Sequence, residues 1–155
     1  MNENVCCFTG HRNIGRDFSR ERLMDAIEKK IAEGVDTFLN GAALGFDMIA
    51  AFCVLELKKK KEYSHIKLHL YVPCVYQDKK WSAKDKDKYK ELLASADFID
   101  QPDYKYYDGC MKLRNYKMVH ASAHCICYMN SYATGAGQTV REAERCGLDI
   151  INIAY

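Results

Sequence analysis

The feature that most constrains the fold of this chain is a regular alternation of short apolar runs with amphipathic segments along its 155 residues. The strand-like runs are rich in β-branched and aromatic residues and lie at 4–8, 35–39, 65–72, 98–99, 124–129 and 149–153. Segments with helical spacing or capping residues separate them, at 19–33, 46–58, from 82 onward, 109–122 and 138–146. Such alternation predicts an α/β fold, with a mostly parallel sheet of about six strands and helices on both faces.

The overall composition is that of a folded globular protein, with 48% hydrophobic and 28% charged residues. The net charge of +2 does not indicate a dedicated nucleic-acid-binding protein. The lysines at 58–61 follow a predicted helix, and a solvated helix end explains them better than a nucleic-acid patch. No apolar run approaches membrane-spanning length, and the first residues lack a signal core. We therefore expect a cytoplasmic protein without a membrane partner.

The eight cysteines are predicted to be reduced thiols. No two of them form a C-x-x-C pair, and without a secretion signal a disulfide framework is not expected. Several fall in strand-like runs, where free cysteine acts as a small buried hydrophobe. A zinc site built from Cys74, Cys110 and His11 is the weaker alternative, because structural zinc sites usually show paired ligand spacing. We expect no metal.

In a parallel sheet of this kind, ligands bind at the carboxyl ends of the strands, where the strand order reverses. The turn after the first strand reads Thr9-Gly10-His11-Arg12. Glycine there allows close approach of a ligand to the backbone, and arginine can hold a phosphate through two hydrogen bonds. The alternative is that both His11 and Arg12 simply face water.

Two further turns are glycine-rich and lead into predicted helices. The first, after the second strand, contains Gly41, Gly45 and Asp47, and Asp47 either caps the helix or meets a ribose hydroxyl. The second, after the fifth strand, contains Gly135 and Gly137. The turn after the second strand has neither the dinucleotide-binding nor the P-loop pattern. We expect the two turns to open onto a common pocket that accepts negative charge.

Aromatic residues also follow the third strand. Tyr76 and Trp81 lie between the predicted strand end and the next helix. They can stack on a base, although a lone tryptophan before a helix more often packs against the core.

Four stretches together resemble the YpsA-like family of the SLOG superfamily. They are the run at 6–12, Cys-Cys-Phe-Thr-Gly-His-Arg; the run at 41–48, Gly-Ala-Ala-Leu-Gly-Phe-Asp-Met; Arg114-Asn115 with Met118-Val119; and the run at 137–143. This superfamily is a Rossmann-like group that also includes the LOG phosphoribohydrolases and the DNA-processing protein DprA. The resemblance covers nearly the whole chain and implies a three-layer Rossmann-like fold formed by residues 1–155 as a single nucleotide-binding domain.

The resemblance implies particular site residues. LOG enzymes cleave the N-glycosidic bond of nucleoside 5′-monophosphates with an arginine and a glutamate, which Arg114 and Glu142 match here. Two glycines of the LOG motif are replaced by Ala136 and Gln138, which leaves less room for a phosphate. We interpreted Glu142 as lying in the first turn of its helix. The expected ligand-binding residues are Thr9, Gly10, His11, Arg12, Gly41, Gly45, Asp47, Asn115, Gly135, Gly137 and Thr139.

Three functions remain open from the sequence. The favoured one is binding of a nucleotide or nucleotide-derived ligand, such as AMP, ADP-ribose or NAD, as a sensor or regulator that requires no cofactor. The alternative is phosphoribohydrolase-like cleavage with Arg114 and Glu142 as catalytic residues. The third is DprA-like binding of single-stranded DNA, for which no basic stripe interleaved with aromatic residues stands out. A homodimer is suggested only by the pairing of LOG-like relatives.

Overall fold

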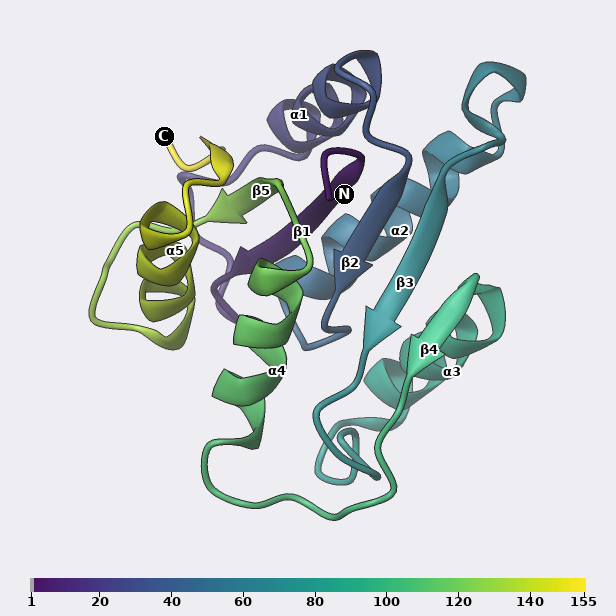
Figure 1. Ribbon diagram of the computed structural model, residues 1–155. Coiled ribbons are helices and arrows are strands. Elements are labelled where there is room, and N and C mark those ends of the chain that lie inside the picture. The colour runs from purple at the N-terminus through teal and green to yellow at the C-terminus, as the bar shows by residue number, and fades with distance from the viewer. Residues whose placement is uncertain (1) are drawn as a thin grey trace.

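The computed structural model describes residues 2–155 and contains a six-stranded parallel sheet (Figure 1). The strand order is β4-β3-β2-β1-β5-β6, and every neighbouring pair is parallel. The predicted α/β fold is thereby confirmed. The strands are β1 Val5–Gly10, β2 Thr37–Asn40, β3 Lys67–Tyr71, β4 Phe98–Asp100, β5 His124–Tyr128 and β6 Asp149–Asn152.

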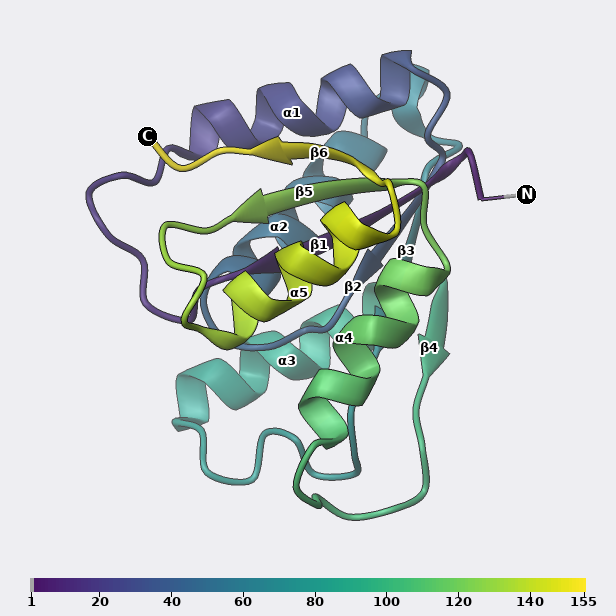
Figure 2. The same cartoon turned by 60° about the vertical axis from the view of Figure 1, so that its left-hand side comes forward.

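Five α-helices cover the two faces of this sheet (Figures 1 and 2). One face carries α1 (Arg20–Ala32), α2 (Phe46–Lys58) and α3 (Ala83–Ser95), and the other carries α4 (Cys110–His120) and α5 (Gly135–Arg145). A short 3-10 helix, η1, spans Lys61–Tyr63. The chain moves outward from β1 to β4 and then returns to the other side of β1. Because parallel crossovers are right-handed, this reversal moves the later helices to the opposite face.

The reversal of strand order lies between β1 and β5. These strands pair from Cys6 with His124 to Gly10 with Tyr128. The pairing continues one residue further, since the His11 N–H donates to the Tyr128 carbonyl at 3.2 Å. The loops that follow β1 and β5 therefore start side by side, which is the usual ligand-binding position in such folds.

Alternation along the central strands divides the core between the two faces. Cys6 and Phe8 of β1 belong to the core under α1 and α2, whereas Cys7 belongs to the core under α4 and α5. In β5, Ile126 packs in the first core and Cys127 in the second. All eight cysteines are free thiols, and all except Cys146 are buried. The strand cysteines act as small hydrophobic residues, as the sequence predicted.

Helix α5 begins earlier than its sequence indicated. Its N-cap is Thr134, whose Oγ1 accepts a hydrogen bond from the Gly137 N–H at 3.0 Å. The helix therefore starts at Gly135 instead of near 138, and its first turn contains no acidic residue. The expectation that Glu142 lies in the first turn is wrong, because the threonine cap brings the glycines into the helix.

No helix among residues 2–155 has both the length and the apolar character needed to cross a membrane.

The cap at Thr134 gives a test of how α5 begins. We expect Thr134→Ala to lower the free energy of unfolding by about 1 kcal/mol, because the Gly137 N–H loses its acceptor. Thr134→Ser keeps the hydroxyl and should stay close to the wild type. Urea denaturation of the three proteins measures the difference. Equal losses in the alanine and serine variants would show that the hydroxyl does not cap the helix.

Candidate functional site

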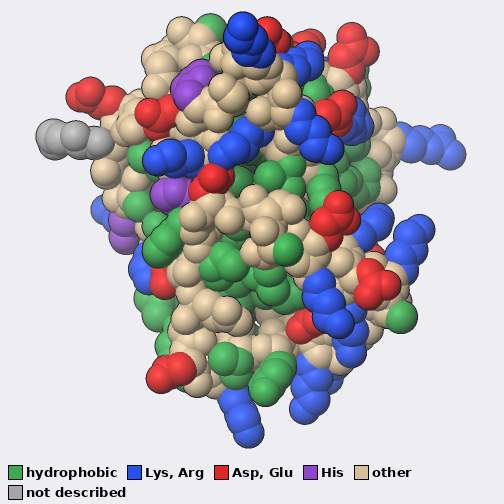
Figure 3. All heavy atoms as spheres, turned by 90° about the vertical axis from the view of Figure 1, so that its right-hand side faces the viewer, with side chains coloured by type: hydrophobic (Ala, Val, Ile, Leu, Met, Phe, Trp, Pro, Cys, Tyr) green, Lys and Arg blue, Asp and Glu red, His purple; other side chains and the backbone are tan. Residues whose placement is uncertain are grey.

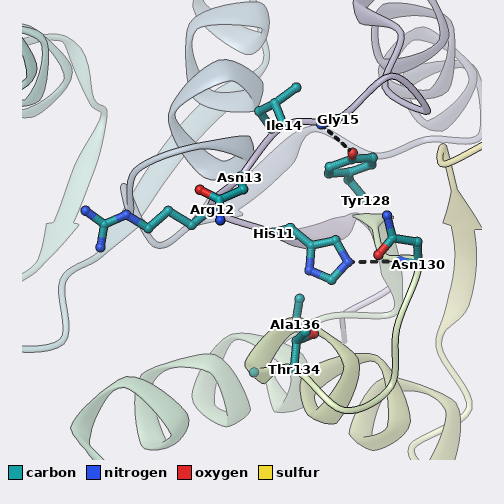
Figure 4. Close-up of a pocket in the computed structure, with 11 residues that line it drawn as sticks. His11, Arg12, Asn13, Ile14, Gly15, Tyr128, Asn130, Thr134 and Ala136 are labelled. Carbon is teal, nitrogen blue, oxygen red and sulfur yellow. Dashed lines mark hydrogen bonds between the residues drawn. The ribbon is translucent and has the colours of Figure 1, made fainter.

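Two adjoining cavities lie at the carboxyl ends of the strands. The first, which we name the switch-point pocket, has a volume of about 600 Å³ and lies where β1 and β5 end (Figure 4). It is formed by the loop after β1, the end of β5 and the first residues of α5. Its lining residues are Gly10, His11, Arg12, Asn13, Ile14, Gly15, Tyr128, Asn130, Thr134, Gly135 and Ala136.

Hydrogen bonds between the loops fix the walls of the switch-point pocket. His11 Nε2 accepts the Asn130 N–H at 2.9 Å, which places the proton of a neutral imidazole on Nδ1. The Tyr128 hydroxyl donates to Asp17 at 2.5 Å and accepts the Gly15 N–H at 2.9 Å. This donated bond holds the pKa of Asp17 below its usual value. In Figure 4 the His11 ring points toward Asn130, whereas the Arg12 side chain extends away from both.

The second cavity, which we name the arginine pocket, has a volume of about 690 Å³. It shares Gly10, Arg12, Gly135 and Ala136 with the switch-point pocket, so the two cavities have a common wall. The loop after β2 and the start of α5 both line it, as expected from the sequence. Its lining residues are Thr9, Gly10, Arg12, Ala43, Leu44, Asp47, Cys74, Tyr76, Gln77, Lys79, Lys80, Trp81, Tyr106, Met111, Arg114, Asn115, Gly135 and Ala136.

Arg114, on the first turns of α4, is the buried cation of the arginine pocket, with only 6% of its surface exposed. Its Nη1 donates to the carbonyl of Gly41 at 2.7 Å and to that of Tyr71 at 2.9 Å. Its Nε donates to the Asn115 side chain at 2.8 Å. Among residues 2–155, no acceptor for Nη2 is present. Arg114 therefore joins α4 to the ends of β2 and β3, and one of its terminal nitrogens has no partner among these residues.

Asp47, in the first turn of α2, is the acidic residue of this pocket and is 7% exposed. It does not act as the N-cap, because the cap position is Gly45 and no side chain caps this helix. Burial raises the pKa of Asp47 to about 6, although the charge of Arg114 and the Ala43 N–H act in the opposite direction. A carboxyl group with such a pKa is common at binding and catalytic sites.

The sequence analysis missed Asn40, which shapes the loop that carries Asp47. Asn40 is fully buried; its Oδ1 accepts the Ala42 N–H at 2.7 Å, and its Nδ2 donates to the Asp47 carbonyl at 2.7 Å. Ala42 has a φ of 54°, a strained conformation for a residue other than glycine. The side chain of Asn40 thus offsets the strain and fixes the direction of the loop. An Asn-Gly pair at a strand end was the available signal.

The first two residues of α5, Gly135 and Ala136, line both cavities. The Gly137 N–H is taken by Thr134 Oγ1 and the Gln138 N–H by the Thr134 carbonyl. For the Gly135 and Ala136 N–H groups, no acceptor is present within the described part of the chain, and both residues line the two pockets. Free amides at the positive end of a helix dipole attract anions.

Most glycines at the site serve packing within the protein. A Cβ at Gly10 would lie closer than 3.0 Å to the Phe46 ring, and one at Gly41 would meet Arg114 and Asp47 at similar distances. Gly45 has a φ of 87°, and its Cβ would meet the backbone of Arg12. At Gly137 the Cβ would collide with Ser131 and Tyr132. Of the five, only Gly135 has open space beside it.

Aromatic and basic residues form the rim of the arginine pocket. Tyr76 is 72% exposed and Tyr106 is 64% exposed, and they come from the loops that follow β3 and β4. A backbone bond from the Val75 N–H to the Tyr104 carbonyl, 2.9 Å long, joins these loops. Figure 3 shows the side of the molecule that carries β4, where hydrophobic side chains lie across the middle and lower part of the view and basic ones lie beside them. Trp81 also packs edge-on against Tyr89, which is the packing role that the sequence allowed, and it lines the arginine pocket.

One buried polar atom faces no partner. Gln77 Oε1 is the single buried side-chain oxygen or nitrogen without a hydrogen bond among the residues that the structure describes. Gln77 lines the arginine pocket, and its Nε2 makes only long contacts, of 3.5 Å to the Gly41 carbonyl and 3.4 Å to the Tyr89 hydroxyl. A buried unpaired group of this kind is a natural acceptor for a ligand donor.

The structure brings most of the predicted site residues together. Thr9, Gly10, Arg12, Asp47, Arg114, Asn115 and Gly135 line the arginine pocket, and His11 lines the switch-point pocket. Those that line neither cavity are Gly41, Gly45, Gly137, Thr139 and Glu142. The Gly41 carbonyl accepts a hydrogen bond from Arg114 Nη1. Thr139 Oγ1 donates to the Gly135 carbonyl within α5 at 2.9 Å.

Glu142 lies apart from Arg114. Its carboxylate accepts two hydrogen bonds from Arg145, both 2.7 Å, and contacts His120 Nε2 at 2.5 Å. These partners hold the pKa of Glu142 near 2. Glu142 thus joins the end of α4 to α5, and its contacts include neither Arg114 nor a pocket-lining residue.

Two side-chain groups outside the pockets have metal-ligand chemistry, and each already holds a cation of the protein. The group of Glu33, His124 and Asp149 surrounds the buried ammonium of Lys30, which is 2.9 Å from His124 Nδ1. In the group of His120, Glu142 and Cys146, Arg145 occupies both carboxylate oxygens. No metal is assigned to either.

Comparison with known proteins places the chain among SLOG proteins. The family model described as the YspA SLOG family matches residues 6–145. The UPF0398 protein of Halalkalibacterium halodurans is 32% identical over 104 residues, which cover 67% of this chain and 54% of that protein. The prophage-derived protein YoqJ of Bacillus subtilis is 43% identical over 81 residues, covering 52% of this chain and 46% of YoqJ. The matched region thus spans about half the length of these relatives.

Solved structures with the same fold include two DNA-processing proteins. DprA from Helicobacter pylori, described for its single-stranded DNA binding mode, has a TM-score of 0.66 and 18% identity, covering 96% of this chain and 64% of DprA. DprA from Streptococcus pneumoniae has a TM-score of 0.62 and 16% identity, covering 94% of this chain and 48% of that one. At such identities the likeness concerns the fold alone.

The packing of the glycines predicts effects of different size for two alanine substitutions. We expect Gly45→Ala to lower the free energy of unfolding by about 2 to 4 kcal/mol, because of the positive φ and the collision with Arg12. Gly135→Ala should change it by less than about 1 kcal/mol, because its Cβ meets open space in a helix. Denaturant unfolding compares them, and similar losses would contradict this account of the loop.

The contacts of Glu142 predict a pH-dependent stabilisation. A carboxyl whose pKa is lowered in the folded state stabilises the fold above its unfolded-state pKa, and the effect disappears as the pH falls. We expect Glu142→Gln to unfold at lower urea concentration than the wild type at pH 7, with a gap that closes between about pH 4.5 and 2. The exposed Glu91→Gln on α3 serves as control. A gap independent of pH would show that the ion pairs contribute nothing.

Proposed function

Because this chain belongs to the YspA SLOG family, we propose that its arginine pocket binds a nucleotide or a nucleotide-derived ligand through a phosphate group. The observation that carries the proposal is the convergence of two kinds of anion-binding group on one cavity. The free Gly135 and Ala136 amides of α5 and the side chains of Arg12 and Arg114 all line it. Helix amides and arginines are the groups with which proteins hold phosphates.

The rest of the cavity suits the base and sugar of such a ligand. Tyr76, Trp81 and Tyr106 offer aromatic surfaces at the rim, on which a base can stack. Gln77 offers an unpaired amide oxygen to an exocyclic amino group. A volume of about 690 Å³ lies within the range of small-molecule sites.

The proposal is one of binding, as in a sensor, because the carboxylates needed for the alternative reaction are not gathered here. Glycoside cleavage usually requires two carboxyl groups beside the scissile bond. Among the described residues, Asp47 is the single acidic side chain that lines the arginine pocket, and Glu142 is engaged with Arg145 and His120. Any cleavage by this protein would therefore have to proceed without Glu142.

A ligand panel tests the proposal. We expect AMP, ADP-ribose or NAD to raise the melting temperature and to bind in calorimetry, while adenosine, which lacks the phosphate, binds at least tenfold more weakly. Chromatography of the same samples detects free base. If none of the phosphorylated ligands binds, the proposal fails. Binding restricted to a single-stranded oligonucleotide, with steep salt dependence, would instead favour a DNA-binding function.

Two arginines of one loop form a matched pair. Arg12 lines both cavities and Arg16 lines neither, although both are exposed. We expect Arg12→Gln to weaken binding of the phosphorylated ligand about tenfold or more, with an unchanged melting temperature, and Arg16→Gln to bind like the wild type. Equal effects would mean that only the general charge of the loop matters. Glu142→Gln should retain ligand binding and, if base is released, its rate.

A further inference from the structure

Asp47 is a negative group built into the pocket for which a phosphate is proposed. Asp47 and Arg114 both lie beside Gly41, since a Cβ at Gly41 would lie closer than 3.0 Å to both side chains. Nevertheless, no ion pair within 4.0 Å joins them among residues 2–155. The guanidinium instead donates hydrogen bonds to the carbonyls of Gly41 and Tyr71. The charge of Arg114 is thus compensated only in part by Asp47.

The protonation state of Asp47 decides what the pocket presents to an anion. An ionised carboxylate accepts hydrogen bonds only, and it repels a phosphate in a cavity with little water. A protonated carboxyl donates one hydrogen bond and leaves the positive charge of Arg114 available. Since burial raises the pKa of Asp47 to about 6, both states are accessible between pH 5 and 8.

Other charged or titratable groups around Asp47 come from α4 and from the loops after β1, β3 and β4. Arg114 lies on α4, and Arg12 lies on the loop after β1. The loops after β3 and β4 contribute only basic, thiol and phenol groups, namely Cys74, Tyr76, Lys79, Lys80 and Tyr106. His11 lines the adjoining cavity, where its Nε2 is held by the Asn130 N–H. Asp47 is thus the one acid among the residues that line either cavity.

We propose that Asp47 determines the anion selectivity of the arginine pocket by taking up a proton when a dianionic ligand binds. The inference rests on the proposed function and adds its coupling to pH. A bound dianion stabilises the protonated carboxyl, and by linkage protonation of the carboxyl strengthens anion binding. Affinity then falls about tenfold for each pH unit above the pKa of Asp47.

The probe must keep a constant charge over this pH range. A phosphate monoester titrates near pH 6 and would mask the effect. ADP-ribose carries a diphosphate diester and sulfate is a dianion throughout, so both are suitable. We expect calorimetry of ADP-ribose in buffers of different ionisation enthalpy to show uptake of close to one proton at pH 7.5, and binding at least tenfold tighter at pH 5.5.

The variant Asp47→Asn removes the titrating group and keeps its size. It should bind ADP-ribose at pH 7.5 at least as tightly as the wild type binds at pH 5.5, without proton uptake. Asp78→Asn, on the loop after β3 but outside both cavities, should behave like the wild type. If Asp47→Asn does not fold, carboxyl NMR of the wild type gives the same answer, because sulfate should raise the pKa of Asp47.

The outcomes separate this inference from the proposed function. Binding of ADP-ribose with no proton uptake, or with the same pH dependence in Asp47→Asn, overturns the role of Asp47 and leaves the ligand proposal intact. Proton release on binding at pH 5.5, where Asp47 is still largely protonated, would mean that Asp47 binds as a carboxylate to a ligand hydroxyl, and it would likewise overturn the inference. Absence of binding at both pH values would refute both.

Discussion

The hydrogen bonds from the guanidinium of Arg114 to two strand-end carbonyls are the interaction on which the site depends. The carbonyls of Gly41 and Tyr71 lie at the ends of β2 and β3, and both accept hydrogen bonds from Arg114. By binding both, Arg114 fixes the first turns of α4 over the sheet edge. The same contact requires a glycine at position 41 and leaves Asp47 beside a positive charge. One buried side chain thus links fold, cavity shape and electrostatics.

The alternation of strands and helices was enough to predict the parallel sheet and its two helical layers, because each segment buries apolar residues with its own period. The alternation also directed attention to the turns that follow the first, second, third and fifth strands, and Arg12, Asp47 and Gly135 from such turns line the arginine pocket. Arg114, on α4, was expected from the family resemblance alone. The sequence could not predict which residues of the loop after β3 line the pocket, as Gln77 does, because their positions depend on how distant loops pack.

Glycine patterns were a less reliable guide than the turns that contain them. Gly10, Gly41 and Gly45 suggested close approach of a ligand, whereas in the structure Phe46, Arg114 and the backbone of Arg12 occupy the space that a side chain would fill. The position of Glu142 was misjudged for a related reason. The threonine cap starts α5 three residues earlier than predicted, so Glu142 lies beyond the first turn, where its carboxylate contacts His120 and Arg145. Local features such as a helix cap or a side chain packed against a glycine therefore decide which residues line a cavity.

The hydrogen bond between Val75 and Tyr104 has a consequence for how the cavity exchanges its contents. This bond joins the loops that carry Tyr76 and Tyr106 at the rim of the arginine pocket. The two loops therefore separate at this point only when the bond breaks, and such a separation opens the entrance to the pocket. Solvent exchange at the single amide of Val75 therefore reports how often the entrance opens. If a bound ligand slows the exchange of this amide, the exchange rate reports how long the ligand stays bound, which an equilibrium affinity does not reveal.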